Sequence, residues 1–390
     1  MSKNNSFLYA RKKEMRSFIQ FLNFELILAS KTNKINSGRR KQPQAHIFRR
    51  KWSIKIMVKM GIIGYGYWGP NIVRNFLSQE KAQIISICDI DKEALNKAKK
   101  NYPKLTMISD PDEVLSSTEI DAIAIVTPVY THYKLAKKAL ENGKHIFVEK
   151  PFTSSVAEAE ELIELADRKR LKIMVDHTFL FTGAVRRIKA LVEDGILGNL
   201  YYYDSTRVNL GLFQHDINVI WDLAPHDLSI MDYIIQEKPT GITATGTEHF
   251  GRGLEDVAYI TVYFANNIIA HFNVNWLSPV KIRMTLIGGE KKMLVWNDLE
   301  SDEKLKVYDR GVDIEDKEGI YELLVSYRAG DIWTPMVDTT EALKLEAEYF
   351  LECIENNNTP INDGHAGLNV VKILEASDLS LKNNGKLVKL

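Results

Sequence analysis

The stretch MVKMGIIGYGYWGPNIVRNF at residues 57–76 constrains the fold of this chain more than any other. It opens with a short apolar run rich in β-branched side chains, which is typical of a buried strand. Gly64, Gly66 and Gly69 follow in G-x-G-x-x-G spacing, and apolar residues at helical spacing follow Pro70. A strand, a glycine turn and a helix in this order predict a dinucleotide-binding unit, because a pyrophosphate can approach the turn and the free N–H groups of the helix. A glycine-rich turn without a ligand is the alternative.

The next apolar run, residues 83–88, ends at Asp89. Asp89 lies 20 residues after Gly69, where dinucleotide-binding units place a carboxylate that hydrogen-bonds a ribose 2′-OH. The same carboxylate would repel the 2′-phosphate of NADP, so the sequence predicts NAD as the cofactor. The alternative for Asp89 is a strand-end or cap role beside Asp91, which is placed to cap the next helix.

Strands and helices continue to alternate after Asp89, which predicts a parallel sheet with helices on both faces. Further strands are expected at 105–108, 122–126, 145–148 and 173–176. The carboxyl ends of parallel strands meet at one edge, and such sheets bind their ligands there. The residues that the sequence predicts at this cofactor edge are Gly64, Gly66, Tyr67, Trp68, Gly69, Asp89, Thr127, Pro128, His132, Glu149 and Lys150.

After about residue 181 the pattern changes to strands separated by short breaks. The pairs Asn266-Asn267 and Gly288-Gly289 are typical of hairpin turns, which predicts a mostly antiparallel sheet. Its strands are expected at 200–208, 242–247, 257–264, 268–276, 281–287 and 292–296, with helices at 224–235, 339–355 and 367–383. The sequence therefore predicts an α/β fold, with a Rossmann domain at 57–178 and a C-terminal α+β domain at 179–390.

The net charge of zero conceals a difference between the first 56 residues and the rest. Residues 1–56 hold 14 Lys and Arg against two acidic residues, whereas the remainder holds 37 basic and 49 acidic residues. An acidic body argues against nucleic acid as a partner. We interpret residues 1–56 as a disordered or over-predicted basic extension, with the natural start at Met57. A secretory signal and an organellar transit peptide are the alternatives.

The two cysteines, Cys88 and Cys353, indicate no disulfide framework and a reducing compartment, so we expect a cytoplasmic protein. No apolar run approaches the roughly 20 residues that span a bilayer, so we expect no membrane partner.

Lys150 lies between Glu149 and Pro151, at a strand end on the cofactor edge. A lysine in that place can exchange a proton during catalysis if burial and neighbouring charges favour its neutral form. Pro151 restricts Lys150 to extended geometry and makes a cis peptide bond conceivable. A structural turn is the alternative for this tripeptide.

Asp222 and His226, in the segment WDLAPHD, share a face if the segment is helical, with Pro225 tolerated in the first turn. Asp222 would then orient or charge-stabilise His226, a grouping suited to removing a hydroxyl proton during hydride transfer. A surface pair is one alternative. A metal site is another, but His215 and His249 lie at no metal-ligand spacing, so we predict no metal.

Arg207 and Asn209 end the first strand of the second sheet, and we predict them as contacts to an anionic or polar substrate. His132 and His177 each follow a strand end. For both histidines a structural role is the alternative to a ligand contact.

Four motifs in one order, GYGYWG, ICDID, TPVYTHYKLAKKALENGKHIFVEKP and DLAPHD, resemble the Gfo/Idh/MocA family of nicotinamide-dependent oxidoreductases. The resemblance covers about residues 58–390, and the extension 1–56 has no counterpart in it. It implies a Rossmann domain followed by an open-faced antiparallel sheet that commonly mediates dimers or tetramers. It also implies that Lys150, Asp222 and His226 act together at the nicotinamide.

The family acts on sugars, cyclitols and nucleotide sugars. The segments GYGYWGPN and NVIWDLAPHD look like those of members that oxidise nucleotide-linked N-acetylglucosamine at C3. We therefore expect oxidation of a secondary hydroxyl of a sugar ring, with a nucleotide sugar as the first choice. An inositol or free-sugar dehydrogenase is the alternative enzyme. A non-catalytic NAD-sensing regulator is the alternative of another class, although this chain keeps the proton-transfer residues that a regulator should have lost.

A protein that begins at Met57 should express in soluble form, bind NAD and turn over substrate as the full chain does, because the first Rossmann strand starts at Val58. Side-by-side measurements of soluble yield, NAD affinity and kcat check this. Loss of folding or activity on removal of residues 1–56 would contradict the interpretation of this segment as dispensable.

Overall fold

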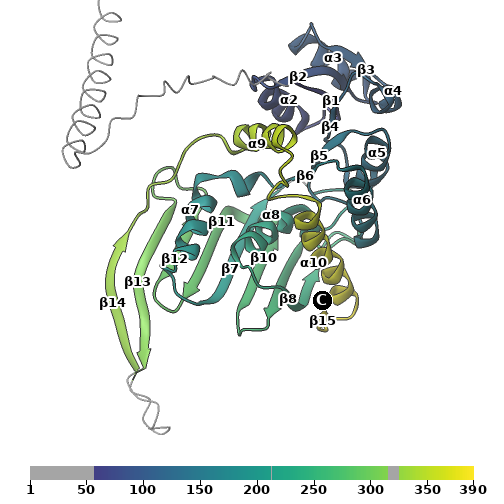
Figure 1. Ribbon diagram of the computed structural model, residues 1–390. Helices are drawn as coiled ribbons and strands as arrows, with labels where there is room; N and C mark the ends of the chain where they lie inside the picture. Colours follow the sequence, from purple (N-terminus) through teal and green to yellow (C-terminus); the bar gives the residue numbers. More distant parts are fainter. Residues whose placement is uncertain (1–56, 212, 315–324) are drawn as a thin grey trace, which may run out of the picture. The chain divides into compact units, whose positions relative to one another are not determined.

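The computed structural model describes residues 57–211, 213–314 and 325–390, so the predictions for residues 1–56 lie outside the described residues. The described chain builds a six-stranded sheet and a nine-stranded sheet (Figure 1). The first is a parallel Rossmann sheet flanked by helices, and the second is mixed and mostly antiparallel. The predicted α/β fold class is confirmed.

The six-stranded sheet has the order β3-β2-β1-β4-β5-β6, and every neighbouring pair is parallel. All four residues of its central strand β4 are buried, as a wholly apolar strand between two helical layers requires. Its strands are β1 (Val58–Ile63), β2 (Ala82–Cys88), β3 (Thr106–Ile108), β4 (Ala122–Ile125), β5 (His145–Glu149) and β6 (Ile173–Asp176). Its helices are α2 (Gly69–Leu77), α3 (Lys92–Asn101), α4 (Pro111–Ser116), α5 (Val129–Glu141) and α6 (Val156–Lys169).

The nine-stranded sheet has the order β14-β13-β12-β11-β7-β10-β9-β8-β15. Its pairs are antiparallel except that of β7 with β10, which is parallel. The strands are β7 (Leu200–Leu210), β8 (Pro239–Thr247), β9 (Val257–Phe264), β10 (Ile269–Asn275), β11 (Leu277–Gly289), β12 (Met293–Asn297), β13 (Leu305–Ile314), β14 (Val325–Trp333) and β15 (Val388–Lys389). Sequence reasoning missed β13, β14 and β15, since the first two carry charges and glycine in place of a clean apolar alternation and the last is two residues long.

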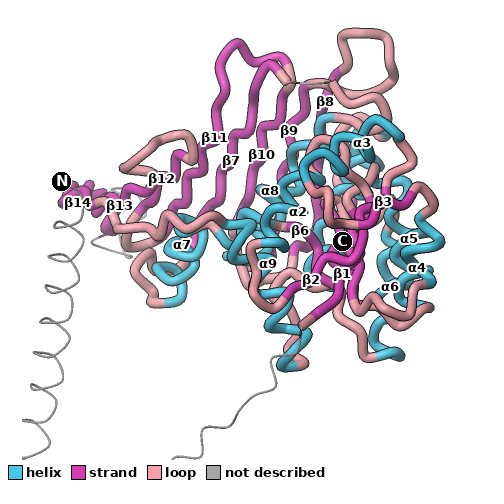
Figure 2. Tube along the Cα trace, turned by 90° about the horizontal axis from the view of Figure 1, so that it is seen from above, coloured by secondary structure: helices cyan, strands magenta, loops and turns pink. Residues whose placement is uncertain are grey.

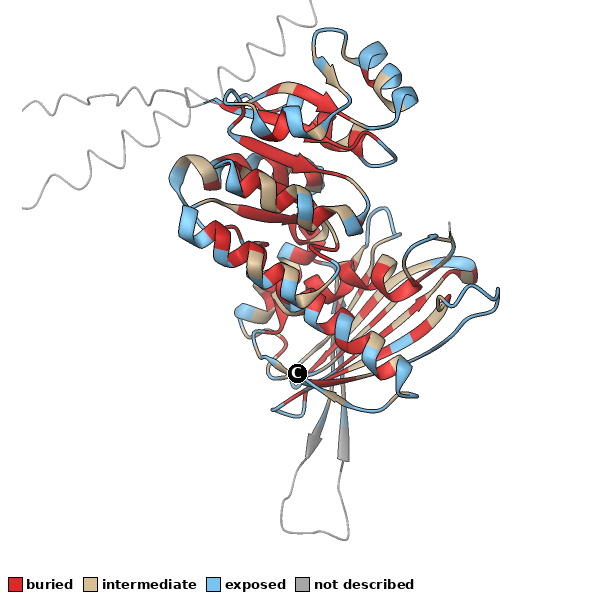
Figure 3. Ribbon diagram, turned by 90° about the vertical axis from the view of Figure 1, so that its right-hand side faces the viewer, coloured by how far each residue is buried: buried red, intermediate tan, exposed pale blue. Residues whose placement is uncertain are grey.

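Helices lie on one face of this sheet and leave the other face open (Figures 1 and 2). Strand β9 shows the asymmetry: Ala258, Ile260 and Val262 are buried, whereas Tyr259 and Tyr263 are exposed. Figure 3 shows buried and exposed stretches along the strands of this sheet. The remaining elements are the short 3₁₀ helix η1 (Thr178–Phe181) and the helices α7 (Gly183–Glu193), α8 (Val219–Ile234), α9 (Ala342–Asn356) and α10 (Gly364–Lys382).

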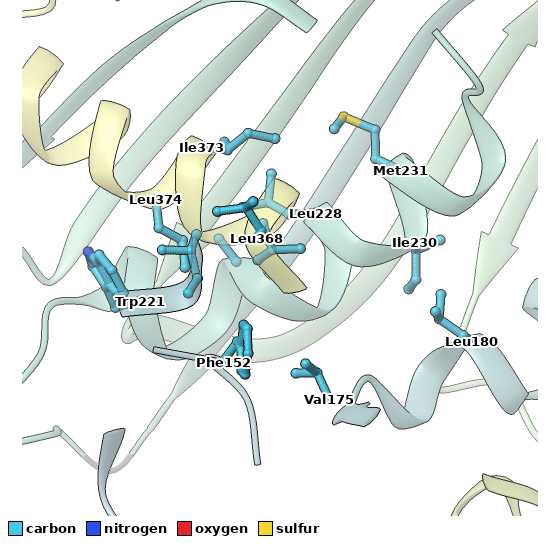
Figure 4. Close-up of a cluster of buried hydrophobic side chains, with 14 of the residues drawn as sticks. Phe152, Val175, Leu180, Trp221, Leu228, Ile230, Met231, Leu368, Ile373 and Leu374 are labelled. Carbon is cyan, nitrogen blue, oxygen red and sulfur yellow. The ribbon is translucent and has the colours of Figure 1, made fainter. Parts of the chain in front are cut away.

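A continuous apolar cluster joins the two sheets beneath α8 and α10 (Figure 4). It brings Trp221 and Leu228 of α8 together with Leu374 of α10, and it includes Phe152 and Val175 from the Rossmann side. Burial of these side chains holds the cofactor edge of the first sheet against the second domain.

The chain returns to the Rossmann sheet through α9. Phe350 of α9 lies edge-on to Phe76 of α2 and Phe147 of β5, with ring centroids 6.2 and 5.7 Å apart, and all three side chains are fully buried. The Rossmann core is therefore completed by residues from the C-terminal part of the sequence.

Helix α8 begins five residues earlier than the sequence predicted. Asn218 caps it by accepting a hydrogen bond from the N–H of Trp221, a cap signal that the prediction overlooked. The prediction of Pro225 in the first turn is therefore wrong, since Pro225 lies inside the helix. Without an N–H, Pro225 cannot bond the carbonyl of Trp221, and the burial of this helix offsets that loss.

Replacing Phe350 by Ala should lower the free energy of unfolding by about 3–5 kcal/mol, because it opens a cavity between α9, α2 and β5. Urea unfolding followed by circular dichroism checks this. The control is Glu348→Ala, an exposed position on the same helix. A loss from Phe350→Ala no larger than that of the control would show that α9 does not complete the core.

Candidate active site

The glycine turn between β1 and α2 is shaped for close approach of a ligand. Gly64 has a φ of +104°, and a Cβ there would meet the carbonyl oxygen of Val126 at 2.1 Å. A Cβ at Gly69 would meet the carbonyl oxygen of Gly64 at 2.5 Å, whereas a Cβ at Gly66 would meet nothing within 4 Å. Helix α2 has no side-chain cap and no acidic residue in its first turn. Its N–H groups are thus available to a phosphate beside the open space at Gly66.

Asp89, at the end of β2, lies directly beside this turn. Its carboxylate accepts hydrogen bonds from the N–H groups of Tyr65 (2.6 Å) and Asp91 (2.9 Å). Two backbone donors fix the carboxylate in one orientation and leave lone pairs for ribose hydroxyl groups. These residues fit the adenosine half of a dinucleotide.

Tyr67 and Trp68 lie on the outer side of the turn, with exposed fractions of 90% and 37%. The indole N–H of Trp68 donates to Oδ2 of Asp176 at the end of β6 (3.2 Å). The turn after β1 is thus tied to the far strand of the sheet, and Trp68 lies at the edge where sequence reasoning placed the cofactor.

His132 is not placed to touch a cofactor. Its side chain is 1% exposed, with Nε2 2.7 Å from the carbonyl oxygen of Thr127 and Nδ1 2.9 Å from that of Pro151. Burial lowers the pKa of His132. The prediction that His132 binds the cofactor does not fit this placement. Its role is to hold together the loops after β4 and β5, where Thr127 is half-buried and Pro128 is exposed.

Lys150 reaches from the cofactor edge to helix α8. Its Nζ donates a hydrogen bond to the carbonyl oxygen of Asp222 (2.9 Å) and lies 3.9 Å from Oδ1 of the same residue. The indole N–H of Trp276 donates to Oδ2 of Asp222 (3.0 Å). The Lys150–Pro151 peptide bond is cis, as the sequence allowed. Lys150 and Asp222, 72 residues apart in sequence, therefore meet at one place.

His226 lies one turn after Asp222 on α8, with its ring edge-on to Phe179 at 5.0 Å between centroids. Within the described residues its buried Nδ1 has no hydrogen-bond partner. Burial, followed by the charges of Lys150, Arg207 and Arg283, holds the pKa of His226 well below its ordinary value. The imidazole is therefore neutral at neutral pH and able to accept a proton.

The predicted effect of Asp222 on His226 is wrong. We expected Asp222 to orient or charge-stabilise the imidazole, but the Asp222 carboxylate faces Trp276 and Lys150. Between Asp222 and His226 the described structure has no hydrogen bond, and the cations around His226 lower its pKa. Helical spacing places two residues on one face without making their polar atoms meet.

Arg207 is engaged in a buried ion pair. Its Nε and Nη2 donate to the two carboxylate oxygens of Asp227 at 2.7 and 2.9 Å, and the side chain is about 5% exposed. The predicted substrate contact does not fit this placement, since Asp227 occupies the guanidinium. Asn209 is half-buried at the end of the same strand, and its substrate contact stays a prediction.

Sequence reasoning missed three residues of this site. Phe179 places its ring under both Arg207 (4.6 Å) and Arg283 (5.7 Å), Asp227 neutralises Arg207, and Trp276 holds Asp222. Asp227 stands in the segment WDLAPHD and could have been singled out as a further carboxylate. Phe179 and Trp276 carry no sequence signal, because their roles arise from packing across elements.

Among the described residues, the other histidines are not grouped as metal ligands. His177 is 1% exposed, neither ring nitrogen has a partner within the described residues, and burial lowers its pKa to about 4. His249 pairs with Asp256 at 2.6 Å. Over the described ranges, no group of three His, Cys, Asp or Glu side chains is placed to bind a metal ion. No helix there is long and apolar enough to cross a membrane.

Two family models match the chain. The model of an oxidoreductase family with an NAD-binding Rossmann fold, Gfo/Idh/MocA, matches residues 58–177, and the Gfo/Idh/MocA C-terminal domain matches residues 185–295. Together they span more than half of the chain. The chain belongs to the Gfo/Idh/MocA family of oxidoreductases, and NAD is the cofactor of its Rossmann domain.

Similar proteins include the UDP-N-acetylglucosamine 3-dehydrogenase of Acidithiobacillus ferrooxidans, 26% identical over 81% of this chain and 95% of that protein. The scyllo-inositol 2-dehydrogenase (NAD(+)) of Bacillus subtilis is 26% identical over 78% of this chain and 88% of that protein. An uncharacterized oxidoreductase of Escherichia coli is 32% identical, but the chain spans about half of its length. The solved structure of the Acidithiobacillus ferrooxidans enzyme superposes with a TM-score of 0.70, covering 84% of this chain and 99% of that one at 24% identity.

Asp89→Ser should narrow the preference for NAD over NADP, which we expect to be about 10-fold or more in the unchanged protein. The carboxylate that repels a 2′-phosphate is then absent. Measured kcat/KM for both cofactors checks this. Asp91→Ser is the control, because serine can still cap α3 and Asp89 is retained. Equal kcat/KM for NAD and NADP in the unchanged protein would contradict the assignment of Asp89.

Proposed function

We propose that this protein is an NAD-dependent dehydrogenase that oxidises a secondary hydroxyl group of a sugar ring. The observation that carries the proposal is the meeting of Lys150 with α8 beside the neutral imidazole of His226, at the edge where the glycine turn binds the dinucleotide. A proton acceptor and a cation side by side are what alcohol oxidation requires.

The proposed reaction breaks a C–H and an O–H bond of the substrate. The glycine turn and Asp89 would hold NAD, which would supply the acceptor for the hydride of the C–H bond. His226 accepts the hydroxyl proton, because its pKa is held low enough to keep the imidazole neutral. Lys150 provides a positive charge for the oxygen that loses the proton and can pass a proton on. Asp222 acts on Lys150, through its carbonyl oxygen and carboxylate, as a positioning residue.

For the substrate we propose a nucleotide sugar, oxidised at C3 of a UDP-N-acetylglucosamine-like ring. The near-complete alignment with the UDP-N-acetylglucosamine 3-dehydrogenase supports this choice, together with the segments GYGYWGPN and NVIWDLAPHD. An inositol or a free sugar is the second candidate, favoured by the alignment with the scyllo-inositol dehydrogenase at the same identity. A screen of nucleotide sugars, inositols and free sugars for NADH formation decides between them. Turnover of inositol with none of any nucleotide sugar would refute the first choice.

The regulator alternative is disfavoured because Lys150, Asp222 and His226 are retained and grouped.

We further propose a homodimer or homotetramer formed through the open face of the nine-stranded sheet. The exposed Tyr259 and Tyr263 of β9 support this, since aromatic side chains on an uncovered face favour association. The cytoplasmic location stays a prediction.

Lys150→Ala and His226→Ala should each lower kcat by roughly 10²–10⁴, while NAD affinity changes little, because both residues act on the proton and not on the nucleotide. The double variant should lose much less than the product of the single effects, as residues acting as one unit do. Stopped-flow turnover and NAD titration measure these quantities.

The matched controls are Lys134→Ala and His365→Ala, two exposed positions.

In the unchanged protein the pKa read from the acid limb of the pH profile of kcat/KM should lie below the ordinary histidine value of 6.5, since burial and neighbouring cations lower the pKa of His226. Near-normal turnover of His226→Ala would remove the histidine from the mechanism and leave Lys150 as the base.

A further inference from the structure

Three carboxyl groups gather behind Lys150. Glu149 and Asp176 are the last residues of β5 and β6 and are register partners on these neighbouring parallel strands. Glu346 comes from α9 and is fully buried. Asp176 is 2% exposed, so most of this carboxyl cluster (Glu149, Asp176 and Glu346) is removed from water.

Asp176 is the acceptor of the cluster. Its Oδ2 accepts from the indole N–H of Trp68 (3.2 Å), and its Oδ1 accepts from the hydroxyl group of Thr178. Each oxygen of Asp176 thus has a donor, one from the turn after β1 and one from η1.

Glu149 and Glu346 each have one satisfied and one unsatisfied oxygen. Oε2 of Glu149 accepts from the N–H of Lys150 (3.1 Å), and Oε1 of Glu346 accepts from Nδ2 of Asn362 (2.8 Å). Oε1 of Glu149 and Oε2 of Glu346 are buried, and within the described residues neither has a donor. A buried carboxylate oxygen without a donor is unfavourable, whereas a protonated carboxyl oxygen is itself a donor.

Protonation of Glu149 and of Glu346 would make the unsatisfied oxygen of each a hydrogen-bond donor. Asp176 neighbours both glutamates: Glu149 is its register partner, and the Asn362 amide that donates to Glu346 also donates to the carbonyl oxygen of Val175, next to Asp176. Burial and the neighbouring charge of Asp176 raise the pKa of Glu149 and of Glu346 well above the ordinary value. The other titratable groups that face the cluster are Lys150 and His177.

We propose that Glu346 is a positioning residue of the active site, which in its protonated form donates a hydrogen bond to Asp176. Asp176 in turn holds Trp68 of the cofactor turn. Together with Glu149, Asp176 also holds the strand end that carries Lys150. Asp176 is the neighbour through which Glu346 acts on the cofactor turn, since Trp68 of that turn donates to Asp176. The inference rests on the proposed function for its effect on NAD, but the protonation of Glu346 is tested without NAD or substrate.

The first test asks whether Glu346 carries a proton. Glu346→Gln replaces the acid O–H by an amide N–H and keeps the same donor, and Glu348→Gln on the exposed face of α9 is its matched control. The infrared band of protonated carboxyl groups at neutral pH should weaken in Glu346→Gln and stay unchanged in Glu348→Gln. A band of equal intensity in the unchanged protein and Glu346→Gln would overturn the proposal.

The pH dependence of Tm is a second readout of the same proton. A glutamate with a raised pKa in the folded state ionises on unfolding, so its contribution to stability is complete below its ordinary value of 4.5 and is lost as pH rises through its folded pKa. Glu346→Gln removes this contribution, so its Tm should fall less between pH 5 and 8 than that of the unchanged protein. Identical slopes in the two proteins would count against the proposal.

The third test asks whether the hydrogen bond positions the cofactor turn. Glu346→Leu fills the space without a donor and should weaken NAD binding by about 10-fold or more, while Glu346→Gln keeps near-normal affinity. Equal weakening by both variants would show that a negative charge is needed, which overturns the proposal. If Glu346→Leu does not fold, the infrared and Tm measurements on Glu346→Gln still decide. Failure of the unchanged protein to bind NAD would refute the proposed function and leave those two measurements valid.

Discussion

The hydrogen bond from Nζ of Lys150 to the carbonyl oxygen of Asp222 is the contact on which the site depends. It joins the carboxyl end of β5 to helix α8, and so it brings the cofactor edge of one sheet to the residues of the other. The apolar cluster beneath α8 and α10 holds both ends of this bond in place. A lysine on a strand end would otherwise extend into water, because its charge is better solvated there.

Charge balance around Lys150 explains why the residues beside it behave as they do. Arg207 is buried, and its bidentate pair with Asp227 satisfies the guanidinium. Truncating one partner of such a pair would leave an uncompensated charge in the core, at a cost of about 3–5 kcal/mol. The pair does not cancel the positive potential at His226. Burial is the largest cause of the lowered pKa of this histidine, and the charges of Lys150, Arg207 and Arg283 lower it further. The neutral imidazole of His226 thus lies among cations, an arrangement that favours an anionic oxygen atom nearby.

The sequence was informative where the site depends on the order of strands, turns and helices along the chain. It was uninformative where the site depends on side-chain packing between elements. Glycine spacing and the strand that ends at Asp89 follow from local patterns, and the structure places Asp89 against the turn as the fingerprint requires. The cofactor edge was predictable because all parallel strands end on the same side. The partners of Asp222, Arg207 and His132 were not predictable, since each lies on another element, and spacing along a helix or strand does not say which polar atoms meet.

Helix α9 shows why this chain is not two domains placed one after the other. Phe350 fills the Rossmann core between Phe76 and Phe147, and four residues earlier Glu346 reaches the strand ends of the same sheet. One turn of helix thus provides an apolar anchor and a polar one. The apolar anchor fixes the position of α9, and that position places the buried carboxyl group of Glu346 near Asp176. Without Phe350 the side chain of Glu346 would turn toward water, because a solvated glutamate has the lower free energy. Packing at one side of α9 therefore makes possible the hydrogen bonding at the other, and through Trp68 it extends to the turn that binds the dinucleotide.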